Sequence, residues 1–214
     1  MNLFSQLEVE PTYEELAPGA VLMRGLALSQ DREFLAAIDD VIAAAPLRHT
    51  TTPSGLPMSV MSTNCGNWRW ISRPAVADSQ FSTTSAPRPR PLMPHVLSEF
   101  AIRAATLAGF PKFTPDSCHI NRYEARTKLG LHQDRHECDL TQPIVSVSFG
   151  LQAVFLFGTM NRIDKPRHIL LEHGDVFVWG GPSRMCFHGV QPVKPGSHLL
   201  VGPYRINLTF RRVM

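Results

Sequence analysis

Residues 144–157 read IVSVSFGLQAVFLF and set the expected fold class. Both ends of this stretch, 144–149 and 154–157, are rich in β-branched and aromatic residues, which favour strands. Gly150-Leu151-Gln152 between them indicates a turn. Further strands are predicted at 168–171, 176–179 and 205–211. Many short strands separated by turns favour a jelly roll over an open parallel sheet.

Two helices are expected upstream of this β-rich half. Ser29 is a candidate N-cap for the first helix, which should end before Pro46. Its apolar stripe consists of Phe34, Leu35, Ile38, Val41 and Ile42. The second helix is expected to begin near Pro94 and to end at Gly109. Its apolar face consists of Val96, Leu97, Phe100, Ala101, Ala104 and Leu107.

The chain between these helices has a different texture. Residues 50–70 are expected to form a turn-rich hairpin region, with turns at 53–55 and 64–67 and a short strand at 58–61. Residues 78–91 are rich in Ser, Thr, Pro and Arg, which is typical of a surface loop.

Composition bounds the kind of protein. The chain has 214 residues, of which 43% are hydrophobic, a size and balance that fit one globular domain. It contains no run of about 20 apolar residues and no signal-like start, so a soluble, cytoplasmic protein without a membrane segment is expected. Four scattered cysteines are expected to be reduced and buried: Cys65, Cys118, Cys138 and Cys186. The net charge of +3 permits an anionic partner.

His132-Gln133-Asp134 is the sharpest candidate for metal binding. Residues two apart on an extended segment point to the same side, so this imidazole and this carboxylate can converge on one ion. His188 is the candidate third ligand. Two histidines and one carboxylate leave three adjacent positions open, which suits Fe(II) oxygenases, because a cosubstrate and O2 must bind side by side. The alternative interpretation is a surface ion pair and a core histidine.

Residues 205–211 suggest an anion site. Arg205, Asn207, Thr209 and Arg211 alternate with apolar residues, so that two guanidinium groups share one face of the strand. If that face lies inside the barrel, two buried cations require a bound dianion, such as a small dicarboxylate. The alternative interpretation is a solvated face with ordinary surface arginines.

Six segments together resemble the AlkB family of oxidative dealkylases. They are Asn121-Arg122-Tyr123, residues 131–134, residues 143–148, residues 171–176, residues 187–189 and residues 205–211. The likeness extends upstream through residues 58–60, residues 63–66 and Trp70. The resemblance implies a mainly β, double-stranded β-helix core over 111–214, with N-terminal helices and a nucleotide-recognition lid over 17–110, in a single domain.

The resemblance also implies roles for individual residues. The iron ligands would be His132, Asp134 and His188. The cosubstrate 2-oxoglutarate would be held by Asn121, Tyr123, Arg205, Asn207 and Arg211. The target base would be bound by Trp70, Met58, Ser59, Thr52 and His136, with Trp70 stacking on the extruded base.

The implied reaction is direct reversal of alkylation damage. With Fe(II), 2-oxoglutarate and O2, family members hydroxylate the alkyl group of bases such as 1-methyladenine and 3-methylcytosine, and the adduct then releases formaldehyde. The implied partner is alkylated single- or double-stranded DNA or RNA, acted on by a monomer. Two departures bear on the choice of lesion. His136 stands where relatives usually carry an acidic residue, and His119 replaces an apolar residue.

Two other functions are compatible with the same residues. One is a dioxygenase of the same fold that hydroxylates a small molecule or a protein. The other is a non-catalytic, cupin-like module that binds a metal such as zinc, in which the two inward arginines would have no purpose.

Overall fold

The predicted strand pair forms in the computed structural model, which describes residues 10–51, 57–67 and 91–214. β7 (Ile144–Gly150) and β8 (Ala153–Phe157) are joined by a tight turn. Gly150 has φ +82° there, and a Cβ atom at this position would overlap the carbonyl oxygen of Tyr204. The turn therefore requires glycine.

The described strands form two sheets, and all strand pairs within each sheet are antiparallel. The larger sheet has the order β1 (Thr12–Ala17), β2 (Ala20–Arg24), β10 (Val176–Trp179), β7, β12 (Arg205–Arg211), β5 (Ser117–Tyr123), β4 (Pro57–Gly66) and β3 (Arg48–Thr51). The smaller sheet has the order β6 (Leu129–His132), β11 (His188–Val190), β8 and β9 (Arg167–Leu171). This arrangement is the expected jelly roll.

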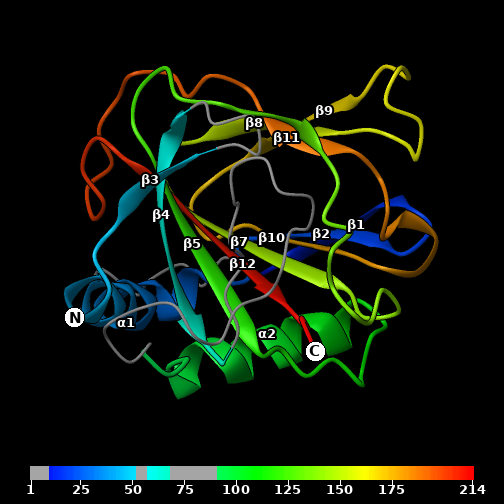
Figure 1. Cartoon of the computed structure of the whole chain (residues 1–214), viewed down its shortest axis with the longest axis horizontal. Helices are drawn as coiled ribbons and strands as arrows, with labels where there is room; N and C mark the ends of the chain where they lie inside the picture. Colours follow the sequence, from blue (N-terminus) through cyan, green and yellow to red (C-terminus); the bar gives the residue numbers. More distant parts are fainter. Residues whose placement is uncertain (1–9, 52–56, 68–90) are drawn as a thin grey trace, which may run out of the picture.

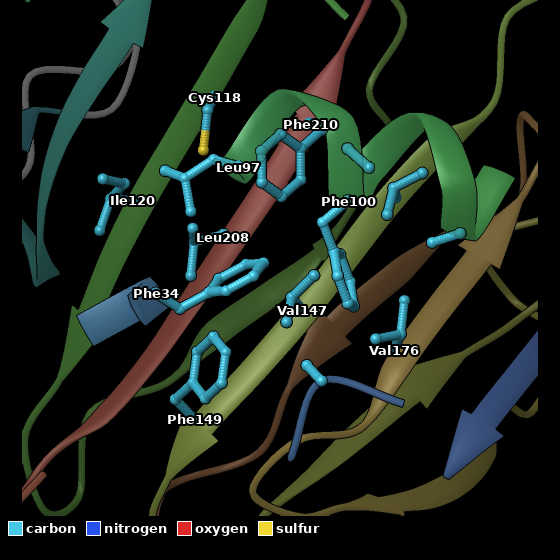
Figure 2. Packing of buried hydrophobic residues seen from close by; sticks show 14 of the residues in the cluster. Phe34, Leu97, Phe100, Cys118, Ile120, Val147, Phe149, Val176, Leu208 and Phe210 are labelled. Atoms are coloured by element: carbon cyan, nitrogen blue, oxygen red, sulfur yellow. The ribbon is translucent and has the colours of Figure 1, made fainter. Parts of the chain in front are cut away.

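Two helices cover the outer face of the larger sheet, on the side away from β8, β9 and β11 (Figure 1). The helices are α1 (Asp31–Ala44) and α2 (His95–Leu107), and two 3-10 turns, η1 (Leu28–Gln30) and η2 (Gly181–Ser183), complete the described elements. Phe34 of α1 points between Phe100, Phe149 and Leu208 in the resulting core (Figure 2). Neither helix of the described ranges is long and apolar enough to cross a membrane.

Alternate residues of the larger sheet face two different cores. Val145 and Val147 of β7 pack under the helices, whereas Ile144 faces the smaller sheet. The core between the sheets is aromatic, with Phe155 in contact with Phe177 across it. Phe155 and Trp179 of this second core also line a cavity.

Several local expectations are wrong. Ser29 lies in η1, and the N-cap of α1 is Gln30, which makes no capping side-chain bond. Leu107 of α2 is exposed rather than part of the apolar face. The turn expected at 64–67 is instead the end of β4, because β5 pairs with that strand as far as Gly66.

The cysteine prediction is correct for three residues of four. All four cysteines are free, but Cys138 is exposed, whereas Cys65, Cys118 and Cys186 are buried. Cys65 and Cys118 are register partners on β4 and β5 and face the helix-covered core. Burial, the largest cause, raises the pKa of the Cys118 thiol well above its usual value, so it behaves as a small apolar group.

The segment expected to hold helices and a lid also supplies strands. β2 pairs with β10 at one side of the larger sheet, and β4 pairs with β5 at the other. The part of the expected lid at 68–90, which includes Trp70, and the expected turn at 53–55 lie outside the described residues.

Candidate metal centre and cosubstrate pocket

Two histidines meet across the smaller sheet. His132 ends β6, His188 begins β11, and the two residues are register partners. Nδ1 of His132 lies 2.9 Å from the carbonyl oxygen of Gly130, and Nδ1 of His188 lies 3.1 Å from that of Cys186. Because a carbonyl oxygen only accepts hydrogen bonds, each Nδ1 carries the hydrogen. Each Nε2 therefore keeps a lone pair for a metal.

Asp134 completes the cluster from the loop after β6. Its Oδ1 lies 3.9 Å from Nε2 of His132, and its Oδ2 lies 3.7 Å from Nε2 of His188. One ligand atom from each of the three residues lies within 4.8 Å of the others. Burial, the largest cause, lowers the pKa of His132 to about 4, so its ring is neutral and able to coordinate at neutral pH. Two imidazoles and one carboxylate match the donor set of Fe(II) oxygenases.

A buried row of alternating charges holds Asp134 from behind. Nη1 of Arg211 lies 3.3 Å from Oδ1 of Asp134 and 3.0 Å from Oε1 of Glu137. Nη2 of Arg184 lies 3.2 Å from Oε2 of Glu137, and its Nη1 donates to the main-chain oxygen of Asp134 at 2.6 Å. Burial raises the pKa of Asp134, but Arg211 and the histidines outweigh it and hold that pKa well below its usual range. The carboxylate is therefore ionised and fixed in place.

Arg205 lies at the opposite end of the same strand face and is 1% exposed. Its Nη2 donates to Oγ of Ser148 at 3.1 Å, and its guanidinium lies 4.9 Å from the centre of the Tyr123 ring. Its Nε and Nη1 are buried without a hydrogen-bond partner within residues 10–51, 57–67 and 91–214. A buried cation is costly unless an anion pairs with it, so Arg205 fits a ligand carboxylate.

One cavity of about 580 Å³ connects the metal cluster with Arg205. All eight residues expected to bind iron or 2-oxoglutarate line it: His132, Asp134, His188, Asn121, Tyr123, Arg205, Asn207 and Arg211. Its volume is in the range of small-ligand sites. Asn207 is held by bonds from its Nδ2 to Oγ of Ser146 and to the main-chain oxygen of Val147, at 2.8 and 3.0 Å.

The residues expected to bind the base are only partly brought together. Met58 and His136 line the cavity. Ser59 is exposed on β4, and its Oγ donates to the carbonyl oxygen of Lys128 at 3.4 Å instead. Thr52 and Trp70 lie outside the described residues.

Sequence reasoning did not identify Glu137 and Arg184, the two residues that complete the buried row of ion pairs behind Asp134. Glu137 contacts Arg211, which is 74 residues away in the chain. Only the three-residue spacing between Asp134 and Glu137 is visible in the sequence, and that spacing is common. The sequence argument assigned a carboxylate of a bound dianion to Arg211, but Asp134 and Glu137 already pair with this side chain.

These features define a class of enzyme. A jelly roll that holds a His–Asp–His cluster at one end of a cavity and, at the other, a buried arginine to which no acidic group in the described part of the chain is paired is suited to a metal-dependent oxygenase with an acidic cosubstrate. Comparisons with known proteins agree. Residues 19–211 match the model of the 2OG-Fe(II) oxygenase superfamily.

Named relatives narrow this class. The chain is 46% identical over 213 residues to the alpha-ketoglutarate-dependent dioxygenase AlkB of Escherichia coli K12, covering 99% of this chain and 97% of the relative. It is 32% identical to the tRNA demethylase abh1 of Schizosaccharomyces pombe, over 63% of this chain and 46% of that protein. The solved structure of OsALKBH1 superposes with a TM-score of 0.81 at 28% identity, covering 94% of this chain and 100% of the other.

The chain belongs to the AlkB dioxygenases of the 2OG-Fe(II) oxygenase superfamily. It is accordingly an oxidoreductase that uses Fe(II), 2-oxoglutarate and O2. The donor set of the cluster and the orphaned guanidinium nitrogens of Arg205 both fit these groups.

Proposed function

We propose that this chain removes alkyl groups oxidatively from damaged bases in DNA or RNA and so reverses the damage directly. The observation that carries the proposal is one cavity that joins the His–Asp–His cluster to the unpaired Arg205. Support for a nucleic acid substrate comes from the relatives, one of which is named a tRNA demethylase and another, from mouse, a nucleic acid dioxygenase.

In this proposal the three ligands of the iron are His132, Asp134 and His188. Arg205 pairs with the far carboxylate of 2-oxoglutarate, and Arg211 holds Asp134 while facing the chelating end. Asn121, Tyr123 and Asn207 supply further hydrogen bonds. When bound, iron with 2-oxoglutarate and O2 supplies the oxidation of an alkyl C–H bond to C–OH, with succinate and CO2 as the other products. The hydroxymethyl group on nitrogen then leaves as formaldehyde and restores the base.

The protein's own part is positioning and shielding. Trp179 and Phe155 pack around the His188 ring, with centroids 5.0 and 6.0 Å away, and restrict its rotation. Arg162, whose guanidinium carbon lies 5.9 Å from the centre of the Phe187 ring, lines the cavity and can meet a phosphate. An aromatic slab at Trp70 would replace the stacking that a flipped base loses. Met58, Ser59, Thr52 and His136 are the other proposed base contacts.

The proposal also covers the domain organisation, the oligomeric state and the cellular compartment of the protein. The lid segment 17–110 and the core 111–214 act as one unit, which is supported by the pairing of β2 with β10 and of β4 with β5. The enzyme acts as a monomer on single or double strands. It works in the cytoplasm, a compartment compatible with its four free cysteines.

Formaldehyde release from an oligonucleotide with one methylated base tests the proposal. The wild-type protein should release formaldehyde only when 2-oxoglutarate is present, and His132→Ala should abolish the release because the metal loses a ligand. His95→Ala, a change at an exposed histidine of α2, is the matched control and should keep full activity. Full activity of His132→Ala would refute the ligand assignment.

The same assay separates the competing functions. Succinate formation without repair of any methylated oligonucleotide would favour a dioxygenase that acts on a small molecule or a protein. Absence of both products would favour a non-catalytic metal module. The orphaned nitrogens of Arg205 argue against that module, since a structural metal site has no need of a buried, unpaired cation.

A further inference from the structure

His119 is a titratable side chain in the cavity that the proposed roles do not use. It lies on β5, and its register partner on β4 is Asn64. Nδ1 of His119 lies 2.7 Å from Oδ1 of Asn64. Because the amide oxygen only accepts, Nδ1 carries the hydrogen. Burial, the largest cause, lowers the pKa of His119 to about 4, so the ring is neutral and its Nε2 is a hydrogen-bond acceptor.

The register of β5 and β12 shows where this acceptor lies along the cavity. Tyr123 is opposite Arg205, and His119 is opposite Thr209, four residues further along each strand. Four residues of a strand span about 13 Å, so the backbone of His119 is displaced along β5 from that of Tyr123. The displacement is toward the end of the sheet that carries Arg211.

His119 lies at the end of the cavity that holds the metal cluster. Besides burial, the groups that shift the pKa of its ring are Arg211, Asp134 and His132, through their charges, and Asn121, through a side-chain hydrogen bond. An alkyl group must approach the metal cluster to react, so the edge of the base that carries the alkyl group enters the part of the cavity that His119 lines.

We infer that His119 is a specificity-determining residue, whose Nε2 accepts a hydrogen bond from the exocyclic amino group next to the alkylated ring nitrogen. This inference rests on the proposed function. Alkylated cytosine and adenine carry such a donor, whereas alkylated uracil and thymine carry a carbonyl oxygen at the corresponding place. Two acceptors facing each other in a buried site leave both unpaired, which is costly. His119 thus favours the amino-bearing lesions.

Oligonucleotides that differ only in one base, 3-methylcytosine or 3-methyluracil, test this role. We would measure dissociation constants with the iron-free protein and kcat/KM for formaldehyde release with the complete enzyme. His119→Leu should lower the preference for 3-methylcytosine about fivefold to tenfold in both measurements, the equivalent of one neutral hydrogen bond. The loss should fall on 3-methylcytosine, with 3-methyluracil unchanged or improved.

Two further variants keep the test decisive if His119→Leu does not fold. His119→Gln retains an acceptor and should recover part of the preference. Asn64→Leu leaves the ring in place but removes the acceptor for Nδ1–H, so it should weaken the preference in the same direction. Thermal unfolding checks each fold. Equal losses on both oligonucleotides, or an unchanged preference in all three variants, would overturn the role of His119.

The wild-type protein distinguishes this inference from the function on which it rests. If it releases formaldehyde from neither oligonucleotide, the proposed function fails and the role of His119 fails with it. If it repairs 3-methylcytosine normally while the variants keep its preference, only the role of His119 fails.

Discussion

Arg205 is the residue on which cosubstrate binding should depend most. Its buried Nε and Nη1 have no hydrogen-bond partner among the described residues, so a carboxylate that reaches them forms charge-assisted hydrogen bonds away from water. Arg205→Met keeps most of the volume and removes the charge. It should raise the KM for 2-oxoglutarate on the order of a hundredfold, measured by succinate formation.

The matched control for this change is Arg212→Met, at the arginine that directly follows β12, lies 3.6 Å from Asp116 and does not line the cavity. Its KM should stay at the wild-type value. An equal KM for the Arg205 variant and the wild type would show that the cosubstrate binds elsewhere.

For single residues, the sequence predicted which way a side chain faces better than which residue it pairs with. The alternation of residues 205–211 is confirmed, because Arg205, Asn207, Thr209 and Arg211 line the cavity while Ile206, Leu208 and Phe210 face the helices. A two-residue period is a local property of a strand and is therefore readable. The pairing of Arg211 with Glu137 is set by folding, so no local pattern reveals it.

At the scale of elements, the close approach of β6 and β11 sets the geometry of the metal cluster. Gly189 follows His188, and a Cβ atom there would lie 2.7 Å from the carbonyl oxygen of Leu129. Gly189→Ala should push the two strands apart and separate His132 from His188. We expect metal affinity to fall about tenfold to hundredfold, measured anaerobically by calorimetric titration with Fe(II).

Gly130→Ala is the control for this prediction, since a Cβ atom at Gly130 meets no atom of the described residues within 4 Å and should leave metal affinity nearly unchanged. Retention of wild-type affinity by the Gly189 variant would mean that the strands tolerate the extra methyl group without moving.

The limits of a strand could be predicted from the sequence where an apolar run defines it, but not where pairing with a distant strand sets its length. The strands at 176–179 and 205–211 have the predicted limits. β4 is longer than predicted, because Asn64 and Gly66 favour turns locally but are held in the strand by β5. β1 was not predicted at all, because the first four of its six residues are exposed and carry no apolar alternation.

At the scale of the whole molecule, stability and chemistry are placed on opposite faces of the larger sheet. Phe34 packs against Phe100 and Phe149, with centroids 4.9 and 5.3 Å away, on the face that lacks the cavity. Phe34→Ala should lower the free energy of unfolding by about 3–5 kcal/mol, measured by urea denaturation.

The KM of that variant for 2-oxoglutarate should stay at the wild-type value at a temperature where the protein remains folded. Ile163→Ala, at a side chain that is 89% exposed, should change the stability little. A raised KM in the Phe34 variant would show that the helix-covered core also shapes the cavity.

The jelly roll itself was predictable from the spacing of short strands and turns, and the comparisons agree with it. The strands that the N-terminal segment adds to the larger sheet were not predictable, since β2 and β4 pair with strands far along the chain. Such pairings follow from the closure of the whole sheet and leave no local trace.

The position of β12 has a consequence for synthesis on the ribosome. Of the described strands it is translated last, yet it lies in the middle of the larger sheet, between β7 and β5. A nascent chain can form hairpins and helices early, but its two half-sheets stay unjoined until this final strand emerges. Because the same strand carries Arg205 and Arg211, which line the cavity, we expect a nascent chain that lacks β12 to be unable to consume the keto acid.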